Sequence, residues 1–189
     1  MNIFLTSSRL FLWMTFVTGI AYPMLILIIG AVGFNNSRNG AIIELNGKPV
    51  GMKLIGQSFK SDRYFFGRPS HAEYDPLYSG GSNLGATSLS LRNTIKTRKK
   101  DLEHLHIGKK VPSELLFASG SGLDPHISLE SAYYQIDRII NSRKLEPVKG
   151  KQLIEKLLHD LTEHQFLSFE KPYINVLLLN IALDKETLL

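Results

Sequence analysis

The sequence predicts one apolar membrane helix followed by a single soluble α+β domain. Three observations carry this prediction: a long uncharged apolar run near the amino terminus, a hairpin signal after it, and helical patterns that precede a short apolar run near the carboxyl terminus. A chain of 189 residues is long enough for one sizeable domain and an appendage. We expect a tail over 1–9, the membrane helix over 10–34, a linker over 35–40 and the soluble domain over 41–189.

Charge and cysteine content exclude several classes of function. The net charge is +5; residues 1–40 carry Arg9, Arg38 and no acidic side chain, which leaves 20 basic and 17 acidic side chains in the rest of the chain. That balance differs from the strongly basic surface of a nucleic-acid-binding domain, so we expect no nucleic-acid partner. The chain has no cysteine, which excludes a disulfide framework, thiol catalysis and thiolate metal ligands.

The apolar run from Leu10 to Phe34 is the strongest signal in the sequence, and it carries no charge. As a helix, these 25 residues would span about 37 Å, whereas the hydrocarbon core of a bilayer is about 30 Å thick. A signal peptide has a shorter apolar region, of about 7–15 residues, and a core helix would show a polar face. We therefore interpret the run as a single membrane crossing, in which Pro23 is tolerated. Counting basic residues on its two sides does not orient it.

The soluble domain is expected to begin with β structure. The apolar stretch Ala41–Leu45 is followed by Asn46-Gly47, a dipeptide suited to a tight hairpin turn, and then by Val50–Ile55. Pro49 must then lie near the turn or on an edge strand. We expect the aromatic segment Gln57–Arg68 to pack against this hairpin.

Helical spacing of apolar residues predicts three helices in the domain. The first covers Ser88–His106 and carries a basic cluster around Lys96–Lys100; a solvated face explains this cluster better than contact with lipid head groups. The second covers Leu129–Arg143, with Ser128 as its N-cap, and the third covers Lys149–Thr162.

A near-continuous apolar run near the carboxyl terminus, Tyr173–Leu179, fits an interior strand. Together with the hairpin and the helices, this predicted strand completes the α+β pattern.

The stretch SGSGLDPHIS, Ser119–Ser128, fits three hypotheses: a phosphate-binding loop, a catalytic Asp–His–Ser set, or a structural turn. No Walker A pattern occurs, and Pro125 stands where a dinucleotide-binding loop needs its third glycine. Asp124 and His126 are too close in sequence for a usual catalytic triad, and no histidine pair has an evident third metal ligand. We favour a structural or interface motif and expect no catalytic or metal-binding residue. The motif residues are Ser119, Gly120, Ser121, Gly122, Asp124 and His126.

Five motifs in fixed order resemble those of a known family, the C subunit of the bacterial Kdp potassium-transporting ATPase. The resemblance covers nearly the whole chain, and the amino-terminal apolar run with its Tyr22-Pro23 pair also matches. The motifs are Leu54-Ile55-Gly56-Gln57-x-Phe59, Tyr64-Phe65-x-x-Arg68-Pro69-Ser70, Ser79-Gly80-Gly81-Ser82-Asn83-Leu84, Ala118 to Ile127, and Asn175-Val176-x-x-Leu179-Asn180-x-Ala182-Leu183-Asp184.

The resemblance implies a non-catalytic accessory subunit of an ATP-driven potassium uptake complex in the cell inner membrane. Its partners would be the potassium-conducting subunit, the ATP-hydrolysing P-type subunit, a small membrane peptide and membrane lipid. The family is described as a catalytic chaperone that raises the ATP affinity of the hydrolysing subunit. The loop Ser79, Gly80, Gly81, Ser82 is similar to an ABC-type signature and is the implied ATP contact. We expect the soluble domain outside the cytoplasm; the alternative function is a binding module that guards the potassium entrance without a nucleotide role.

Overall fold

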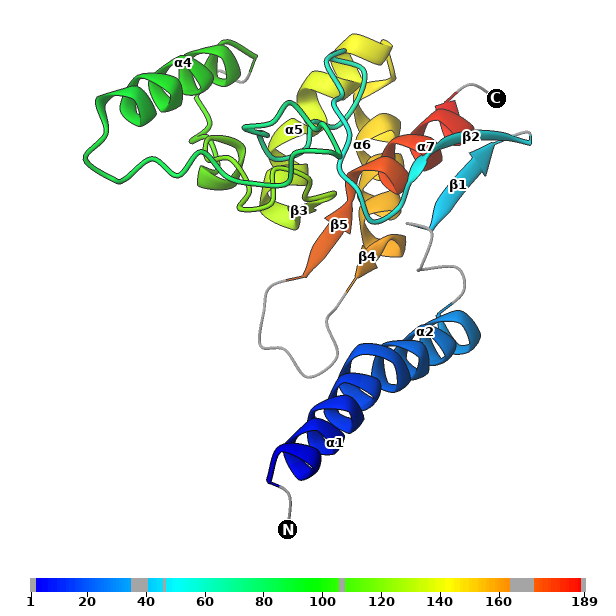
Figure 1. Ribbon diagram of the computed structural model, residues 1–189. Helices are drawn as coiled ribbons and strands as arrows, with labels where there is room; N and C mark the ends of the chain where they lie inside the picture. Colours follow the sequence, from blue (N-terminus) through cyan, green and yellow to red (C-terminus); the bar gives the residue numbers. More distant parts are fainter. Residues whose placement is uncertain (1–2, 35–40, 46, 106–107, 164–171, 188–189) are drawn as a thin grey trace. The chain divides into compact units, whose positions relative to one another are not determined.

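The computed structural model describes residues 3–34, 41–45, 47–105, 108–163 and 172–187 (Figure 1). The chain divides into two compact units, Met1–Ile42 and Ile43–Leu189, and each is treated separately below. The expected linker, 35–40, lies outside the described residues.

The first unit is a continuous helix over Ile3–Gly33. It consists of α1 (Ile3–Phe16), a π-helical turn η1 (Val17–Ala21) and α2 (Tyr22–Gly33). The π turn lies just before Pro23, whose ring would clash with a carbonyl four residues earlier in a regular α-helix. The helix therefore widens by one turn and continues.

The helix is long and apolar enough to cross a membrane, and no side chain in its most apolar window is buried. This exposure argues against a core helix. The helix begins at Ile3, seven residues before the apolar run used to predict it, because Thr6, Ser7 and Ser8 permit helix although they are polar. Where the membrane begins and ends along it stays a prediction.

Two small sheets confirm the α+β class of the second unit. The hairpin joins β1 (Ile42–Leu45) to β2 (Lys48–Met52), and Gly47 in its turn has a φ of 73°. The other sheet has the order β3-β5-β4, with both pairs antiparallel: β3 is His126–Ser128, β4 is Thr162–Glu163 and β5 is Tyr173–Asn175. Because Pro49 lies in a two-stranded sheet, its missing N–H costs no interior ladder bond.

Three helices pack beside the second sheet and build the main core: α5 (Leu129–Arg143), α6 (Pro147–Asp160) and α7 (Val176–Thr187). Ser128 caps α5 as predicted, because its Oγ accepts the Ser131 N–H at 3.2 Å. The residues of this core that are fully shielded from solvent are Phe65, Ile127, Ala132, Ile139, Ile154, Leu158, Ile174, Leu179 and Leu183.

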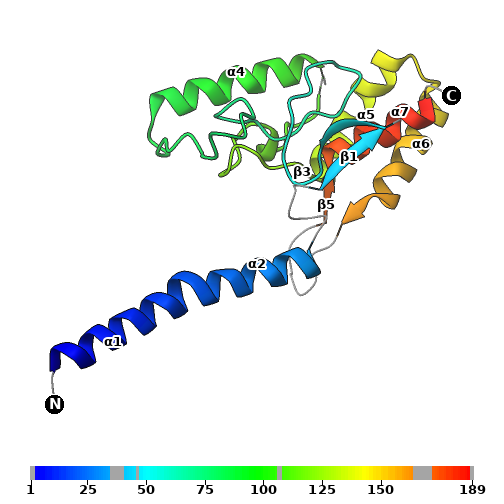
Figure 2. The same ribbon diagram turned by 45° about the vertical axis from the view of Figure 1, so that its right-hand side comes forward.

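A fourth helix, α4 (Leu89–Leu105), lies on the other side of the connecting loops from α6 in both Figure 1 and Figure 2. Its half-buried Ile95 and Leu102 pack against a smaller cluster that includes Leu115 of the 3-10 turn η2 (Ser113–Leu115). The predicted helix over Ser88–His106 is confirmed over Leu89–Leu105, and His106 lies outside the described residues.

The predicted strand Tyr173–Leu179 is wrong beyond Asn175. Only the first three residues are strand, and Val176 begins α7. Asn175 explains the change, because its side-chain Oδ1 accepts the Leu178 N–H at 3.1 Å and thereby caps the helix. A short apolar run does not distinguish a buried strand from a buried helix.

The predicted packing of Gln57–Arg68 on the hairpin is also wrong for most of the segment. Gln57 lies close to Gly51 of β2, but Phe65 is fully buried in the main core. Polar side chains of α5 and α7 hold the backbone of the segment, as described below.

Candidate functional site

The structure brings together two glycine- and serine-rich loops that lie about 40 residues apart in sequence. The Gly80 N–H donates to the Ser121 carbonyl at 2.8 Å, and the Ser79 hydroxyl donates to the same carbonyl at 3.2 Å. We call the assembly of Arg68–Ser70, Ser79–Ser82 and Ser119–Asp124 the loop junction. It contains all the site residues predicted from the sequence except His126, which follows the junction by two residues.

Glycine is required where the two loops touch. Gly122 has a φ of +69°, and a Cβ at this position would lie 2.8 Å from the Gly80 carbonyl oxygen. Gly81 faces the other loop, since a Cβ there would lie 3.3 Å from the Gly120 oxygen. The backbones therefore approach more closely than side chains would allow, and Gly122 also needs a left-handed conformation.

The segment Arg68–Ser70 is the third part of the junction and is bonded to the Ser119–Asp124 loop. The Ser119 N–H donates to the Pro69 carbonyl at 3.1 Å, and Arg68 Nη1 lies 3.0 Å from the Asp124 carboxylate. Ser70 Oγ accepts the Tyr74 N–H, and the Tyr74 hydroxyl in turn donates to the Arg68 carbonyl. Backbone bonds and one ion pair thus connect three of the sequence motifs.

Asp124 is the half-buried charge of the junction. Burial by itself would raise the pKa of its carboxyl, but hydrogen bonds from His126 and the Arg68 guanidinium outweigh burial, so the pKa lies below the ordinary value of 3.8. Its Oδ1 accepts the His126 N–H at 3.0 Å, the bond expected of an Asp-Pro turn. Burial, and then the Asp124 charge, raises the pKa of Tyr74.

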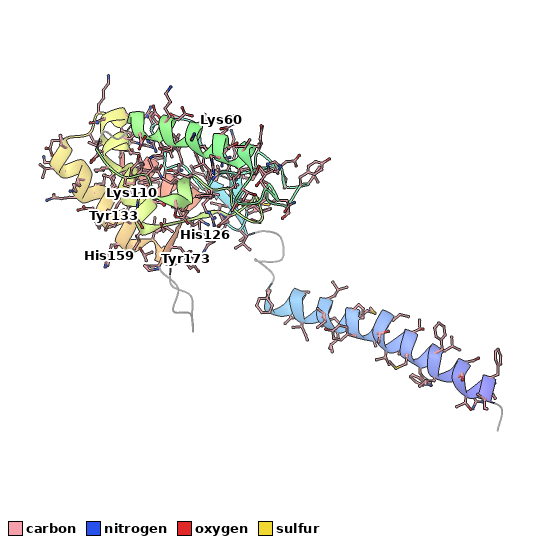
Figure 3. All side chains as sticks on the ribbon, turned by 90° about the vertical axis from the view of Figure 1, so that its left-hand side faces the viewer. Lys60, Lys110, His126, Tyr133, His159 and Tyr173 are labelled. Atoms are coloured by element: carbon pink, nitrogen blue, oxygen red, sulfur yellow. The ribbon has the colours of Figure 1, made fainter. Side chains whose placement is uncertain are left out.

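The His126 ring contacts Asp124 and Tyr173. Its Nδ1 lies 3.5 Å from Asp124 Oδ1, and its ring packs edge-on against Tyr173 with centroids 4.8 Å apart (Figure 3). The Ser121 hydroxyl instead accepts the Leu123 N–H. The arrangement supports a turn rather than a triad, which needs a serine within hydrogen-bond reach of the histidine. Groups of three metal-binding side chains do not occur in the described part of the chain.

Sequence reasoning missed a buried polar clamp that holds the segment Asp62–Phe66. Asn180 of α7 accepts the Phe65 N–H at 2.8 Å and donates to its carbonyl at 3.0 Å, and Gln135 of α5 does the same for Phe66 at 2.8 and 3.1 Å. Two arginines add further bonds to this segment. The clamp residues are Gln135, Arg138, Arg143, Asn180 and Asp184.

The side chains of the two arginines of the clamp are almost completely buried. Arg138 donates to the carbonyls of Asp62 and Tyr64, at 2.6 and 2.9 Å, and lies 3.8 Å above the Phe66 ring. Burial lowers its pKa to about 10, although the Asp62 carboxylate opposes the shift. Arg143 pairs with Asp184 at 2.7 Å. The signal for this clamp in the sequence is the presence of polar residues at positions of α5 and α7 that face the core.

Known proteins match this chain along almost its whole length. The family model described as "KdpC: K+-transporting ATPase, c chain" matches residues 4–185. The chain belongs to this family. That match includes the apolar helix, the loop junction and the clamp, so the resemblance seen in the five motifs is confirmed.

Curated members of the KdpC family are about as long as this chain. The protein named "Potassium-transporting ATPase KdpC subunit" in Paraburkholderia phytofirmans is 41% identical over 189 residues, which cover 97% of each chain. The protein of the same name in Leptospira interrogans is 41% identical over 188 residues, covering 98% of this chain and 95% of its own. A third, in Dechloromonas aromatica, is 41% identical over 183 residues and 94% of each chain.

Proposed function

We propose that this chain is a membrane-anchored, non-catalytic accessory subunit of an ATP-driven potassium uptake complex, which it assembles or stabilises. The family match over residues 4–185 carries the proposal, because it joins the apolar helix and the folded domain in one family of transporter subunits. The loop junction supports it, since backbone hydrogen bonds join three of the family motifs in one place. Its partners would be the potassium-conducting subunit, the ATP-hydrolysing subunit and the small membrane peptide.

Co-purification tests this proposal directly. The tagged full chain, co-expressed with the other subunits, should retain them in fixed stoichiometry after detergent extraction. Replacing Ile3–Gly33 by an unrelated single membrane span, with the domain unchanged, separates the contribution of the anchor from that of the domain. Failure of the natural chain to retain any transporter subunit would overturn the proposed function.

A second candidate role, which requires the domain to face the cytoplasm, is that the subunit raises the affinity of the complex for ATP through Ser79–Ser82. Because the Gly80 N–H and the Ser79 hydroxyl already bind Ser121, a nucleotide would have to use other donors of this loop. Gly80 is the suitable position for a test, because a Cβ there meets no atom within 4 Å, whereas Gly81 faces the Gly120 carbonyl. If the loop contacts ATP, Gly80→Val should raise the KM for ATP of the assembled complex while subunit content stays constant.

The side of the membrane decides whether this nucleotide role is possible. We propose that the domain lies outside the cytoplasm, where it would not meet ATP. The chain has no cysteine, so a single Val148→Cys variant, at a position 63% exposed on α6, gives labelling without background. Labelling by an impermeant maleimide in intact spheroplasts would support the external location and overturn the nucleotide role. Labelling only after lysis would overturn the external location.

A further inference from the structure

We propose that an exposed apolar and basic surface around α4 binds an apolar, acid-rimmed surface on another subunit of the same transporter. This inference rests on the proposed function, because it takes the chain to be part of that complex. We call this region the docking surface. Its apolar members are Leu77, Tyr78, Leu84, Leu89 and Phe117.

These five apolar side chains are exposed to solvent. Leu77 is 86% exposed, Leu89 71% and Tyr78 70%, while Phe117 and Leu84 are 44% and 40% exposed. A single exposed leucine needs no explanation, but an apolar cluster on a soluble domain is typical of an interaction site.

Hydrogen bonds on both sides hold Leu77 and Tyr78 in their exposed positions. The Asp75 carboxylate accepts the Leu77 N–H at 2.9 Å, and the Asp75 carbonyl accepts the Tyr78 N–H at 3.1 Å. Immediately after Tyr78, Ser79 and Gly80 bind Ser121. Binding therefore costs little conformational entropy in this loop, and tyrosine is among the residues enriched in interface hot spots.

The apolar members and α4 form one region of the domain. Arg98 of α4 donates to the Leu116 carbonyl at 2.9 Å, which places the helix beside Phe117. Figures 1 and 2 both show the segment before α4 running back along the helix before it reaches Leu89. Leu89 belongs to α4 itself, and Tyr74, four residues before Tyr78, lies close enough to Arg98 of this helix for the two side chains to interact electrostatically.

The solvent-facing side of α4 makes this surface basic. Arg92, Lys96 and Lys100 are exposed, and within the described residues the ion pair of this helix is Lys99–Glu103 at 3.5 Å. An acidic partner surface would complement this charge and speed association.

A protein partner fits these observations better than a lipid surface does. A helix that lies on a membrane exposes its own apolar face, whereas α4 turns Ile95 and Leu102 towards the domain.

Site-specific photo-crosslinking in the full chain tests the partner. A photoreactive phenylalanine analogue at position 78, in the chain co-expressed with the other subunits, should form an adduct with one of them, identified by mass spectrometry of the purified complex. The same analogue at Val148, an exposed apolar position on α6, is the matched control and should form none.

The other outcomes of crosslinking overturn the inference. The inference fails if the adduct contains a second copy of this chain or lipid, if no adduct forms, or if both positions give equal adducts. The proposed function still stands in these cases, provided that the natural chain co-purifies with the transporter. If it does not co-purify, the proposed function and this inference fail together.

Paired substitutions test the energetic importance of the docking surface. Leu77→Ser with Tyr78→Ser should speed dissociation of the chain from the purified complex about tenfold, as expected for interface hot spots. Lys96→Glu with Lys100→Glu should also speed dissociation at low salt, but much less at high salt, because salt screens the interaction between charges. Val148→Ser with Lys156→Glu is the control on α6 and should dissociate like the natural chain. Dissociation rates of both test pairs equal to that control would overturn the inference.

Discussion

Gly122 and Gly120 stand two residues apart in one loop, yet a side chain would meet different surroundings at each. At Gly122 a Cβ would lie 2.8 Å from a backbone oxygen with φ at +69°, whereas at Gly120 it would meet no atom within 4 Å. We expect Gly122→Ala to lower the free energy of unfolding by about 1–3 kcal/mol, the usual cost of a strained backbone residue. Gly120→Ala is the control. Denaturant unfolding of the full chain in detergent measures both, and equal values would contradict close packing of the two loops.

Asp124 should make the stability of the domain dependent on pH on the acid side. Its pKa is lower in the folded chain than its ordinary value of 3.8, so the folded state favours the ionised form. Its contribution is therefore complete above the ordinary value and is lost as the pH falls through the folded value. We expect Asp124→Asn to flatten the decline of the unfolding midpoint between pH 5 and the acid limit, relative to the natural chain. Asp75→Asn is the comparison, because within the described residues this carboxylate binds a backbone N–H and forms no ion pair with an arginine.

At the scale of elements, the polar clamp fixes the segment Asp62–Phe66 between α5 and α7. Asn180→Leu would leave the buried N–H and carbonyl of Phe65 without their partner, and each such group costs about 1–3 kcal/mol. For the two groups together we expect a loss of stability of about 2–6 kcal/mol, and faster amide exchange at Phe65 than in α6. Asn141→Leu, at an exposed position of α5, is the matched control. Unchanged exchange at Phe65 would show that the clamp does not hold this segment.

At the scale of the whole molecule, the anchor is expected to decide membrane integration. Ile26 lies near the middle of the predicted crossing and is not buried. Ile26→Arg should impair insertion, because a central charge costs roughly 2.5–3.5 kcal/mol when a helix enters the bilayer. Carbonate-resistant membrane content measures insertion, with Ile26→Leu as the control. Equal content for the two variants would contradict the membrane role of this helix.

Some features follow from the sequence because they depend on neighbouring residues only. The apolar run, the helical spacing of α4, α5 and α6, and the Ser128 cap all rest on local periodicity or on a bond within three residues. Local sequence patterns predict the wrong structure where burial determines the conformation. Tyr173–Leu179 satisfies strand and helix patterns equally well, and the Asn175 side chain starts a helix there.

The sequence by itself determined the family, the α+β class, the apolar anchor and the residues of the loop motifs. Only the tertiary structure decided that Gly80 binds Ser121 and that Asn180 and Gln135 hold Phe65 and Phe66. These contacts join residues between 41 and 115 positions apart, and no local pattern specifies which distant backbone a polar side chain will meet. The physical reason is burial: each backbone group of the Asp62–Phe66 segment that leaves water needs a partner, and the packing of α5 and α7 determines which side chains can supply it.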